Sequence, residues 1–404
     1  MSMPRAVRHI NEVRLLDRLY HLGVTTRADL ARELGLMRST VGNLVAGLIE
    51  QGVVCETELG EVNGSGSGGA ARTGRPGQLL RLNAGHAAFI GADVGVGHLS
   101  VVAIDLAGDI VQRRTVAFRA GLGEVQPLIE RLAGLIEDLI AQLPTDLPVQ
   151  GLSLIAPGLV DAEGVVVRAP ALGWQQVPLQ ALMAERLGWD RPVVTENDAN
   201  AFAAAELFGR HRDAAAEALF VYLDAGVGGA LASGGRVLRG QRGRAGEIGH
   251  IHLGEQGFES PTAVQGSFES YVAREAVLAR WRHHGGPGGL LDDFIAALVA
   301  QQGPAWLALT EWAWWMGRGL ASLISVLDPG RIVLGGPLAT LFEPVREPVL
   351  DAIRRHLVAP HELPLIEVSA LTTEACAIGG AMGLHRAHLS IDERLVYGAQ
   401  APVA

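Results

Sequence analysis

One segment of the sequence carries side chains that bind metal ions in many proteins, yet it contains no cysteine. It reads GEIGHIHLGEQGFESPTAVQGSFES and starts at Gly246. Imidazole and carboxylate groups are common zinc ligands, and His252, Glu255 and Glu259 could build such a site. Zinc sites that stabilise a loop usually include thiolates, and the two cysteines of the chain lie far from this segment. The segment therefore indicates an incomplete set of ligands.

Two other segments place an acid before a glycine-rich turn between apolar runs. They are IGADVGVGHLSVVAIDLAGDIV at residues 90–111 and ALFVYLDAGVGGALASGGRVLRG at residues 218–240. Apolar runs bounded by glycine predict buried strands that form hairpins, and backbone N–H groups at such turns can cradle phosphate groups. The repeated pattern predicts two related α/β lobes that face a cleft. DPGRIVLGGPLA, at residues 328–339, predicts one further strand that runs into a Gly-Gly turn.

The first 82 residues predict a winged helix-turn-helix unit. Apolar residues recur with helical spacing over residues 7–20, and Gly23 ends this first helix. Thr26 begins a short second helix that Gly35 closes, and a third helix follows in MRSTVGNLVAGLIEQG. Two predicted strands come next, joined by the glycine- and serine-rich stretch that forms the wing.

The third helix has a polar face that could read DNA. Its polar residues are Arg38, Ser39, Thr40 and Asn43. In a helix-turn-helix unit this end of the helix enters the major groove, where arginine pairs with guanine, asparagine with adenine, and hydroxyl groups with phosphate. Arg72 and Arg75 of the predicted wing could reach the minor groove or the phosphates. The alternative is a helical protein-interaction module with a solvated arginine face.

Charge is divided unevenly along the chain. Residues 1–82 carry a net charge of +2 and the remainder carries −12, and every basic residue is arginine. A basic head on an acidic body is typical of a nucleic-acid reader attached to a domain that does not bind nucleic acid.

Composition favours a cytoplasmic α/β protein. About half of the residues are apolar and glycine is frequent, which suits tight turns between strands and helices. Two cysteines fit a reducing compartment, and no export signal precedes His9. The most apolar stretch, residues 306–327, contains Glu311 and Arg318, so we expect a buried helix there and no membrane partner.

The whole chain resembles transcriptional regulators of the ROK family (repressor, open reading frame, kinase), particularly xylose-repressor-like members. The motifs that carry the resemblance are RSTVGNLVAGLIEQGVV, TGRPG, DVGVGHLSVVAIDLAG, APGLVDAEGVVVRAPALGW, ENDANAFAAAE, LDAGVGG, AGEIGHIHL and GSFESYV. The resemblance implies an α/β fold, with an N-terminal winged helix-turn-helix followed by a two-lobed body that is actin-like or sugar-kinase-like (ribonuclease H-like). The expected units are 1–82, a first lobe over 83–197 and a second lobe over 198–384, with a C-terminal helix over about 385–404 packed on the first lobe.

The resemblance also implies a sugar pocket. Its residues would be Asn197, Asp198, Glu247, His250 and Glu269. Carboxylates and amides suit this task because they pair with sugar hydroxyls. In a kinase Asp198 would be the general base, and in a sensor it would only accept a hydrogen bond. The alternatives are that Asn197 and Asp198 cap a helix, that Glu247 lies in a solvated turn, and that Glu269 is an acid in the first turn of a helix.

The chain departs from the family's kinases at both hairpins. Where those kinases carry Gly-Gly-Thr-Lys or a similar sequence, this chain has Gly95-Val96-Gly97-His98, and Ala225 stands where they usually have threonine. Phosphoryl transfer depends on positioning and on electrostatic stabilisation of the phosphate. These losses predict that the protein is not an enzyme.

The second departure concerns zinc. The family's zinc loop presents a histidine and three cysteines, whereas the matching places here hold His250, Ser260, Thr262 and Ser267. Neutral hydroxyl groups are poor zinc ligands, so we expect no metal and no other cofactor. Packing of Phe268 and Tyr271 would then have to position Glu269.

A further departure affects the choice of sugar. Relatives commonly have asparagine where this chain has Ala171, which removes one amide contact to a ligand hydroxyl. Trp174 nearby could stack on a sugar or pack in the core. An unusual or smaller ligand is therefore expected.

Together these features predict a sugar-responsive DNA-binding regulator, a repressor that a carbohydrate effector releases from double-stranded operator DNA. It would act as a homodimer or homotetramer on a two-fold-symmetric operator. Activation in place of repression stays open. The alternative function is an ATP-dependent carbohydrate kinase with an appended DNA-binding domain, and a third possibility is a body that only mediates oligomerisation.

Overall fold

The computed structural model describes residues 3–57, 78–119, 121–207, 217–241, 243–258, 263–358, 362–371 and 373–390. The N-terminal unit packs three helices against a three-stranded antiparallel sheet of order β1-β3-β2. Its elements are α1 (Met3–Leu22), β1 (Thr25–Thr26), α2 (Arg27–Leu34), α3 (Arg38–Glu50), β2 (Val54–Thr57) and β3 (Leu79–Leu82).

The helix boundaries of this unit follow from local capping. Thr26 accepts a hydrogen bond from the Asp29 backbone N–H at the start of α2. Gly35 ends the same helix with φ +64°, a left-handed conformation that glycine adopts without strain. Both signals were predicted from the sequence, and both are confirmed. The residues between β2 and β3 lie outside the described part of the chain.

The first body unit is built on a five-stranded sheet of order β11-β7-β4-β5-β6. Its strands are β4 (Ala88–Gly95), β5 (His98–Asp105), β6 (Ile110–Ala117), β7 (Val149–Ala156) and β11 (Val193–Asn197). One face packs against α4 (Gln126–Ile140) and α5 (Leu179–Leu187). A small sheet, order β10-β9-β8, lies beside it and comprises β8 (Leu159–Val160), β9 (Val166–Ala169) and β10 (Trp174–Val177). The short turn η2 (Pro170–Leu172) joins β9 to β10, and another short turn, η1 (Ala84–His86), precedes β4.

The second body unit repeats the same topology. Its sheet has the order β14-β13-β12-β15-β16, so each sheet consists of an antiparallel three-stranded meander extended by two parallel strands. The strands are β12 (Ala218–Leu223), β13 (Val227–Ser233), β14 (Arg236–Leu238), β15 (Arg331–Gly335) and β16 (Leu365–Val368). The remaining elements are α6 (Asp198–Leu207), η3 (Ile248–His250), α7 (Phe268–Val272), α8 (Arg274–His283), α9 (Leu291–Val299), α10 (Gly303–Leu327), η4 (Pro337–Leu341), η5 (Glu343–Val345), α11 (Arg346–His356) and α12 (Ala375–His388). The two related lobes predicted from the glycine-rich hairpins are thus confirmed.

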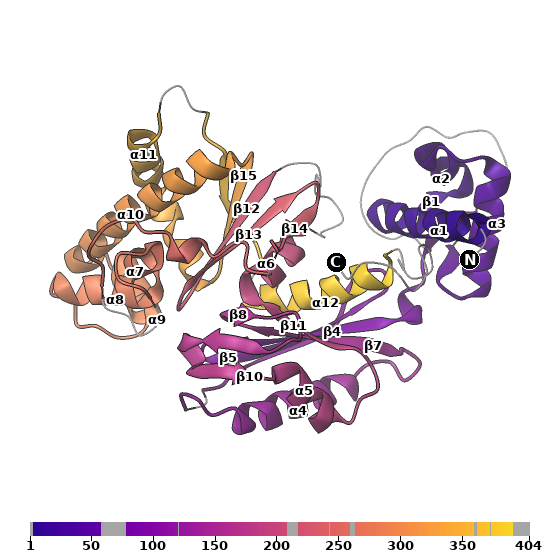
Figure 1. The fold of residues 1–404 in the computed structure, drawn as a ribbon, viewed down its shortest axis with the longest axis horizontal. Helices are drawn as coiled ribbons and strands as arrows, with labels where there is room; N and C mark the ends of the chain where they lie inside the picture. Colours follow the sequence, from indigo (N-terminus) through magenta and orange to yellow (C-terminus); the bar gives the residue numbers. More distant parts are fainter. Residues whose placement is uncertain are drawn as a thin grey trace.

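Helices α6 and α12 lie between the two sheets. Figure 1 shows α12 on the face of the first sheet opposite α4 and α5, with one end near the N-terminal unit. Phe220 and Tyr222 of β12 pack against Phe202 of α6, while the other face of the second sheet packs on α10. The order of layers is therefore helices, sheet, the α6–α12 pair, sheet and helices.

The helix that packs on the first lobe begins earlier than the sequence predicted. α12 begins at Ala375 and ends at His388, whereas the prediction was a helix over about residues 385–404, of which residues 391–404 lie outside the described part. The segment carries glycines at 379, 380 and 383 and is buried on several sides, so it lacks the one-sided apolar stripe that marks a surface helix.

The apolar stretch at residues 306–327 forms most of α10. Ala308, Trp312 and Leu320 of this helix are fully buried in the second core, as predicted. Among the helices that the structure describes, none is long and apolar enough to cross a membrane.

Candidate functional site

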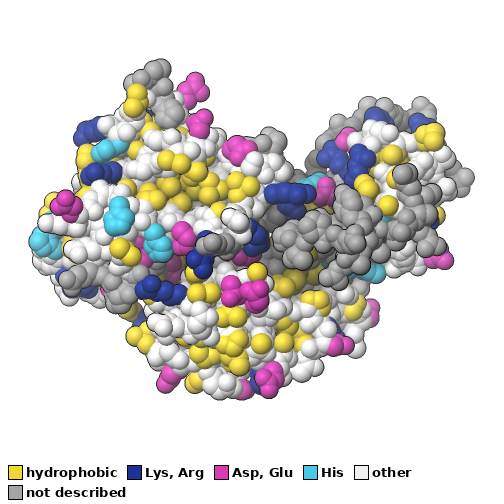
Figure 2. Space-filling view, in the orientation of Figure 1, with side chains coloured by type: hydrophobic (Ala, Val, Ile, Leu, Met, Phe, Trp, Pro, Cys, Tyr) yellow, Lys and Arg dark blue, Asp and Glu magenta, His cyan; other side chains and the backbone are white. Residues whose placement is uncertain are grey.

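The predicted DNA-reading side chains lie on the outer side of α3. Arg38, Ser39 and Asn43 are exposed and Thr40 is half-buried, while the apolar residues of the helix face the core. Within the described part of the chain Arg38 forms no ion pair, whereas Arg18 and Arg32 pair with carboxylates. Figure 2 shows arginine side chains gathered on this unit. Arg72 and Arg75 lie outside the described residues.

The acid of the first hairpin is paired with a histidine of the same hairpin. Asp93 lies two residues before the end of β4 and is 2% exposed, and its Oδ2 atom lies 3.3 Å from Nε2 of His98, which begins β5. Burial raises the pKa of Asp93, and His98 opposes this effect. The imidazole covers the turn, because a Cβ added at Gly95 would lie 2.0 Å from the ring.

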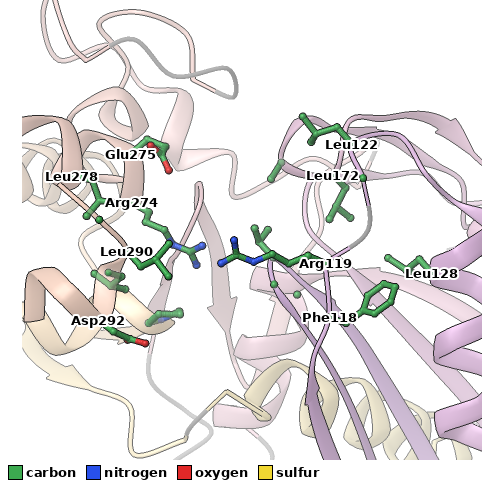
Figure 3. Close-up of a pocket in the computed structure, with 18 of the residues that line it drawn as sticks. Phe118, Arg119, Leu122, Leu128, Leu172, Arg274, Glu275, Leu278, Leu290 and Asp292 are labelled. Atoms are coloured by element: carbon green, nitrogen blue, oxygen red, sulfur yellow. The ribbon is translucent and has the colours of Figure 1, made fainter.

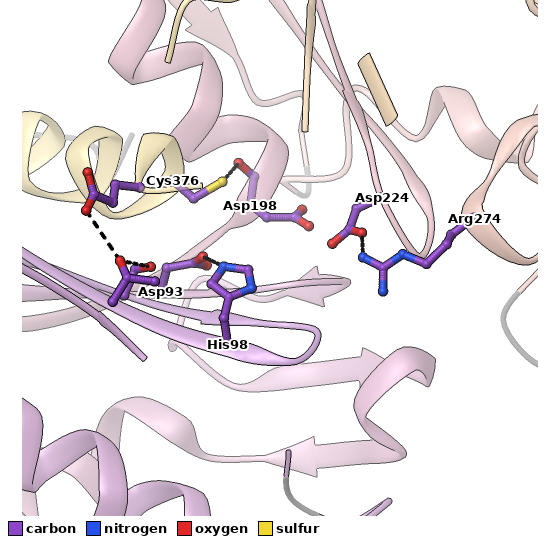
Figure 4. A network of polar contacts seen from close by, with 9 residues as sticks. Asp93, His98, Asp198, Asp224, Arg274 and Cys376 are labelled. Carbon is purple, nitrogen blue, oxygen red and sulfur yellow. Dashed lines mark hydrogen bonds and ion pairs between the residues drawn. The ribbon is translucent and has the colours of Figure 1, made fainter. Parts of the chain in front are cut away.

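The acid of the second hairpin is paired with an arginine. Asp224 follows β12, and its carboxylate forms an ion pair with Arg274, the first residue of α8. The Arg274 backbone N–H also donates to the Asp224 carbonyl over 3.0 Å. Figure 4 shows the Asp93–His98 pair and the Asp224–Arg274 pair, with the carboxylate of Asp198 pointing into the space between them.

Asp198 begins α6 and is the acid whose ionisation the fold changes most clearly. Its Oδ1 atom accepts a hydrogen bond from the Ala199 backbone N–H at 2.8 Å. Burial raises the pKa of Asp198 to about 7, with further contributions from the negative charges of Asp93 and Glu247. This carboxyl group therefore exchanges its proton near neutral pH.

Asn197 serves as a cap for α6. Its Oδ1 atom accepts from the backbone N–H groups of Ala199 and Asn200, and its Nδ2 donates to the Gly158 carbonyl at 2.7 Å. The capping alternative of the sequence analysis is therefore realised. The amide fixes the start of the helix and with it the place of Asp198.

The three other predicted sugar residues surround strand β13. Glu269 in α7 is 7% exposed and accepts a hydrogen bond from the Val227 backbone N–H at 2.8 Å. Burial raises the pKa of Glu269, and the Val227 hydrogen bond opposes this. Glu247 precedes η3 and His250 is its last residue, and this turn packs on β13. Both side chains are exposed and lie 3.5 Å apart. The fold thus brings Asp198, Glu247, His250 and Glu269 to one strand.

Aromatic packing fixes the segment that carries Glu269. Phe268 is fully buried, and the ring of Tyr271 stacks on Trp315 with centroids 3.6 Å apart. Arg280 is also fully buried, donates to the Tyr271 carbonyl at 2.9 Å and lies over the ring of Phe258.

Of the residues that replace the family's zinc ligands, only two are described. Ser267 is buried and caps α7, and His250 is exposed. Ser260, Thr262 and also Glu259 lie outside the described residues. In the part of the chain that the structure covers, no group of three or more histidine, cysteine or acidic side chains could hold a metal ion.

A cavity of about 520 Å³ opens between the two body units. Ala171 and Trp174 line it from the first unit, and Trp174 is 2% exposed, so most of its ring packs in the core. Arg119 and Arg274 line it from opposite sides (Figure 3). The predicted sugar residues around β13 are not part of its lining.

Sequence reasoning missed the cationic residues of this region. Arg274 is 50 residues from Asp224 in the chain, and Arg119 follows a strand without any motif. His98 was noted only as the last residue of the segment that replaces the phosphate-binding motif of the kinases. The position of His98 three residues after the Gly95 turn was a usable signal, because the two ends of a hairpin pair across the ladder.

Comparison with known proteins agrees with this architecture. The ROK family model matches residues 89–387. The chain is 29% identical over 392 residues to a putative xylose repressor of Caldicellulosiruptor sp. (strain Rt8B.4), covering 92% of this chain and 94% of that relative. It is 26% identical, with a TM-score of 0.63, to a ROK family glucokinase from Streptomyces griseus solved with glucose and AMPPNP, over 73% of this chain and 98% of that structure.

A solved ROK family transcriptional regulator, a homolog of the E. coli MLC protein, shares the fold with a TM-score of 0.73 at 24% identity. The likeness covers 96% of this chain and all of that one, so it includes the N-terminal unit. Because the family model spans both repeated sheets and the helices between them, this chain belongs to the ROK family.

Proposed function

We propose that the protein is a sugar-responsive transcriptional repressor that binds operator DNA through α3 and is released by a carbohydrate. It acts in the cytoplasm as a homodimer or homotetramer. The similarity to a putative xylose repressor along the N-terminal unit as well as the body supports this proposal. The glucokinases among the relatives match 72% of this chain, a smaller share than the repressor does.

One observation carries the proposal: helix α12 contacts both the candidate sugar site and the DNA-reading unit. At its start, the Cys376 thiol donates to the main-chain oxygen of Asp198 over 3.5 Å. Further along, Met382 accepts a hydrogen bond from the Tyr20 hydroxyl at 3.7 Å, and His385 packs on the Tyr20 ring with centroids 4.9 Å apart. A ligand that moves α6 therefore acts on α1 through one rigid element. Such coupling needs a differential affinity of only about 1–3 kcal/mol.

The two hairpins support a sensor more than a kinase. A kinase needs free groups at these turns to hold metal and phosphate during transfer. Here His98 pairs with Asp93 and Arg274 pairs with Asp224, so both acids already have side-chain partners from the chain itself. In this setting Asp198 accepts a hydrogen bond from a sugar hydroxyl group but does not act as a general base that removes the hydroxyl proton.

The test is operator binding with and without carbohydrate. Operator fragments selected by the purified protein from genomic DNA are labelled, and fluorescence anisotropy follows their release as monosaccharides and oligosaccharides are added. Arg38→Gln should lower operator affinity about 10- to 100-fold, because one arginine–guanine pair contributes about 1–3 kcal/mol. Arg32→Gln, an exposed arginine of α2, is the matched control and should leave affinity within about twofold.

Two results would refute the repressor: no binding to any duplex fragment, or rapid ATP-dependent phosphorylation of a sugar in the same preparation. The second result would favour the kinase alternative. Equal losses in the Arg38 and Arg32 variants would mean that α3 has no special part in recognition.

We also propose that the loop before Glu269 keeps its shape without zinc. The Tyr271–Trp315 stack and the contacts of Arg280 take the place of metal ligands. The melting temperature is expected to stay unchanged in EDTA, whereas Trp315→Ala should lower it. The change removes a partly buried ring and its stack on Tyr271, and such aromatic pairs contribute about 0.5–1.5 kcal/mol beyond the area that they bury. Elemental analysis that finds stoichiometric zinc would contradict this proposal.

A further inference from the structure

The cavity between the body units contains two converging arginine side chains. Arg119 follows β6 in the first unit, and Arg274 begins α8 in the second. Figure 3 shows their guanidinium groups pointing toward one another across the cavity. Both units must supply a residue, so this arrangement exists only in the assembled body.

The two arginines differ in the ion pairs and hydrogen bonds that they form. Arg274 forms an ion pair with Asp224, while its buried Nε atom has no hydrogen-bond partner in the described part of the chain. Within the same described residues Arg119 has neither an ion pair nor a hydrogen bond, and its side chain is exposed. Burial lowers the pKa of Arg274, Glu275 and Tyr222 oppose this effect, and the charge of Arg119 adds to it. An anion between the two groups would relieve this repulsion.

An excess of basic residues around this cavity is unusual for the acidic body of the protein. Residues 83–404 carry a net charge of −12, yet three arginines and two acids line the cavity. The two acids, Glu275 and Asp292, are at the side of the cavity that carries Arg274, and the side that carries Arg119 has none. The remaining wall is largely glycine, leucine and Phe118, which offers apolar surface to the C–H faces of a sugar ring.

We propose that this cavity binds a carbohydrate that carries an anionic oxygen group, a phosphate or a carboxylate, held between Arg119 and Arg274. The inference rests on the proposed function and adds to it a separate site for an anionic effector, because the lining of the cavity includes none of the predicted sugar residues around β13. Guanidinium groups bind both kinds of anion through paired N–H donors. The volume of about 520 Å³ lies within the range of small-molecule sites. Ala171 in the lining provides no amide for a neutral sugar, so the charge contributes much of the selectivity.

The experiment is isothermal titration of the full-length protein with glucose, glucose 6-phosphate and glucuronate. Inorganic phosphate and ATP are titrated as further probes. At least one anionic sugar should bind about tenfold or more tightly than glucose, since hydrogen bonds to charged groups are strong. Comparing the titration with glucose 6-phosphate and the titration with glucuronate shows which anion the site prefers.

Arg119→Gln should abolish this preference, so that anionic sugars bind with an affinity similar to that of glucose. Arg119→Lys keeps the charge and should retain part of the preference. Arg131→Gln, an exposed arginine of α4 outside the cavity, is the matched control and should behave as wild type. Because Arg119 is exposed and unpaired among the described residues, none of these variants removes a contact on which folding depends.

Three results would overturn the inference: equal affinity for neutral and anionic sugars, equal behaviour of the Arg119 and Arg131 variants, or an Arg119-dependent affinity for ATP without any for anionic sugars. If neutral sugars still release the operator in these cases, the proposed repressor function stands and only the effector class is wrong. If no carbohydrate in the wider operator-release panel acts, both proposals fail.

Discussion

Gly379→Ala is expected to destabilise the protein by about 3 kcal/mol or more. Gly379 lies where α12 crosses α6, and a Cβ added there would lie 1.7 Å from the Ala201 carbonyl oxygen and 2.5 Å from its carbon. Overpacking usually costs about 1–3 kcal/mol, and this clash is with main-chain atoms that no rotamer change can move. The helices would have to separate, and the close packing of α12 on α6 would be lost.

The same helix supplies the matched control. Gly383 has no atom within 4 Å of its added Cβ and is exposed, so Gly383→Ala should stabilise the protein by about 0.5–1 kcal/mol through helix propensity alone. Urea unfolding of both variants and wild type gives the two differences. Similar changes at the two positions would mean that α6 and α12 do not pack as closely as the structure places them.

The sequence was most informative where local chemistry decides the structure. Thr26 and Gly35 fix the ends of α2 through their own hydrogen bonds and dihedral angles, so their neighbours in sequence were enough to place them. The two hairpins were found for a similar reason, because each needs only two apolar runs and a glycine turn.

The sequence was least informative where the tertiary structure decides. Helix α12 is surrounded by β4, β7 and α6, so it is buried on several sides. Its buried glycines allow the neighbouring elements to approach the helix closely. The partners of Asp224 and Asp198 come from segments distant in the chain, Arg274 and Cys376. Asn197 was expected to contact a ligand or to cap a helix, and only the fold reveals that its amide also donates to Gly158 in the β7–β8 turn.

Asp198→Asn is expected to remove a large pH dependence from the stability of the protein. The ordinary pKa of this carboxyl is 3.8, and in the folded chain it is raised to about 7, first by burial and then by the charges of Asp93 and Glu247. Between these two values the folded state keeps a proton that the unfolded state releases. Stability therefore falls as pH rises from about 4 to 7 and levels off above. The difference corresponds to at most about 4 kcal/mol, and solvent reduces it because Asp198 is partly exposed.

The asparagine variant should match wild type near pH 4 and be more stable at pH 8. Its Oδ1 atom still accepts the hydrogen bond from Ala199, so the helix start is preserved while the charge is lost. Unfolding free energies measured from pH 4 to 8 give the comparison, with the exposed Asp146→Asn as control. Parallel curves for the Asp198 variant and wild type would show that this carboxyl does not titrate differently in the fold.

Carbohydrate affinity should change in the opposite direction to stability. In the proposed sensor, sugar hydroxyl groups donate to the ionised form of Asp198, so binding has to release the proton that the apo protein holds below pH 7. Affinity should then rise with pH up to about 7 and become level, while the asparagine variant shows no such rise. At neutral pH the ionised carboxylate of Asp198 would thus lower the stability of the fold and at the same time bind the effector. Both effects are expected of a buried acid that serves ligand recognition.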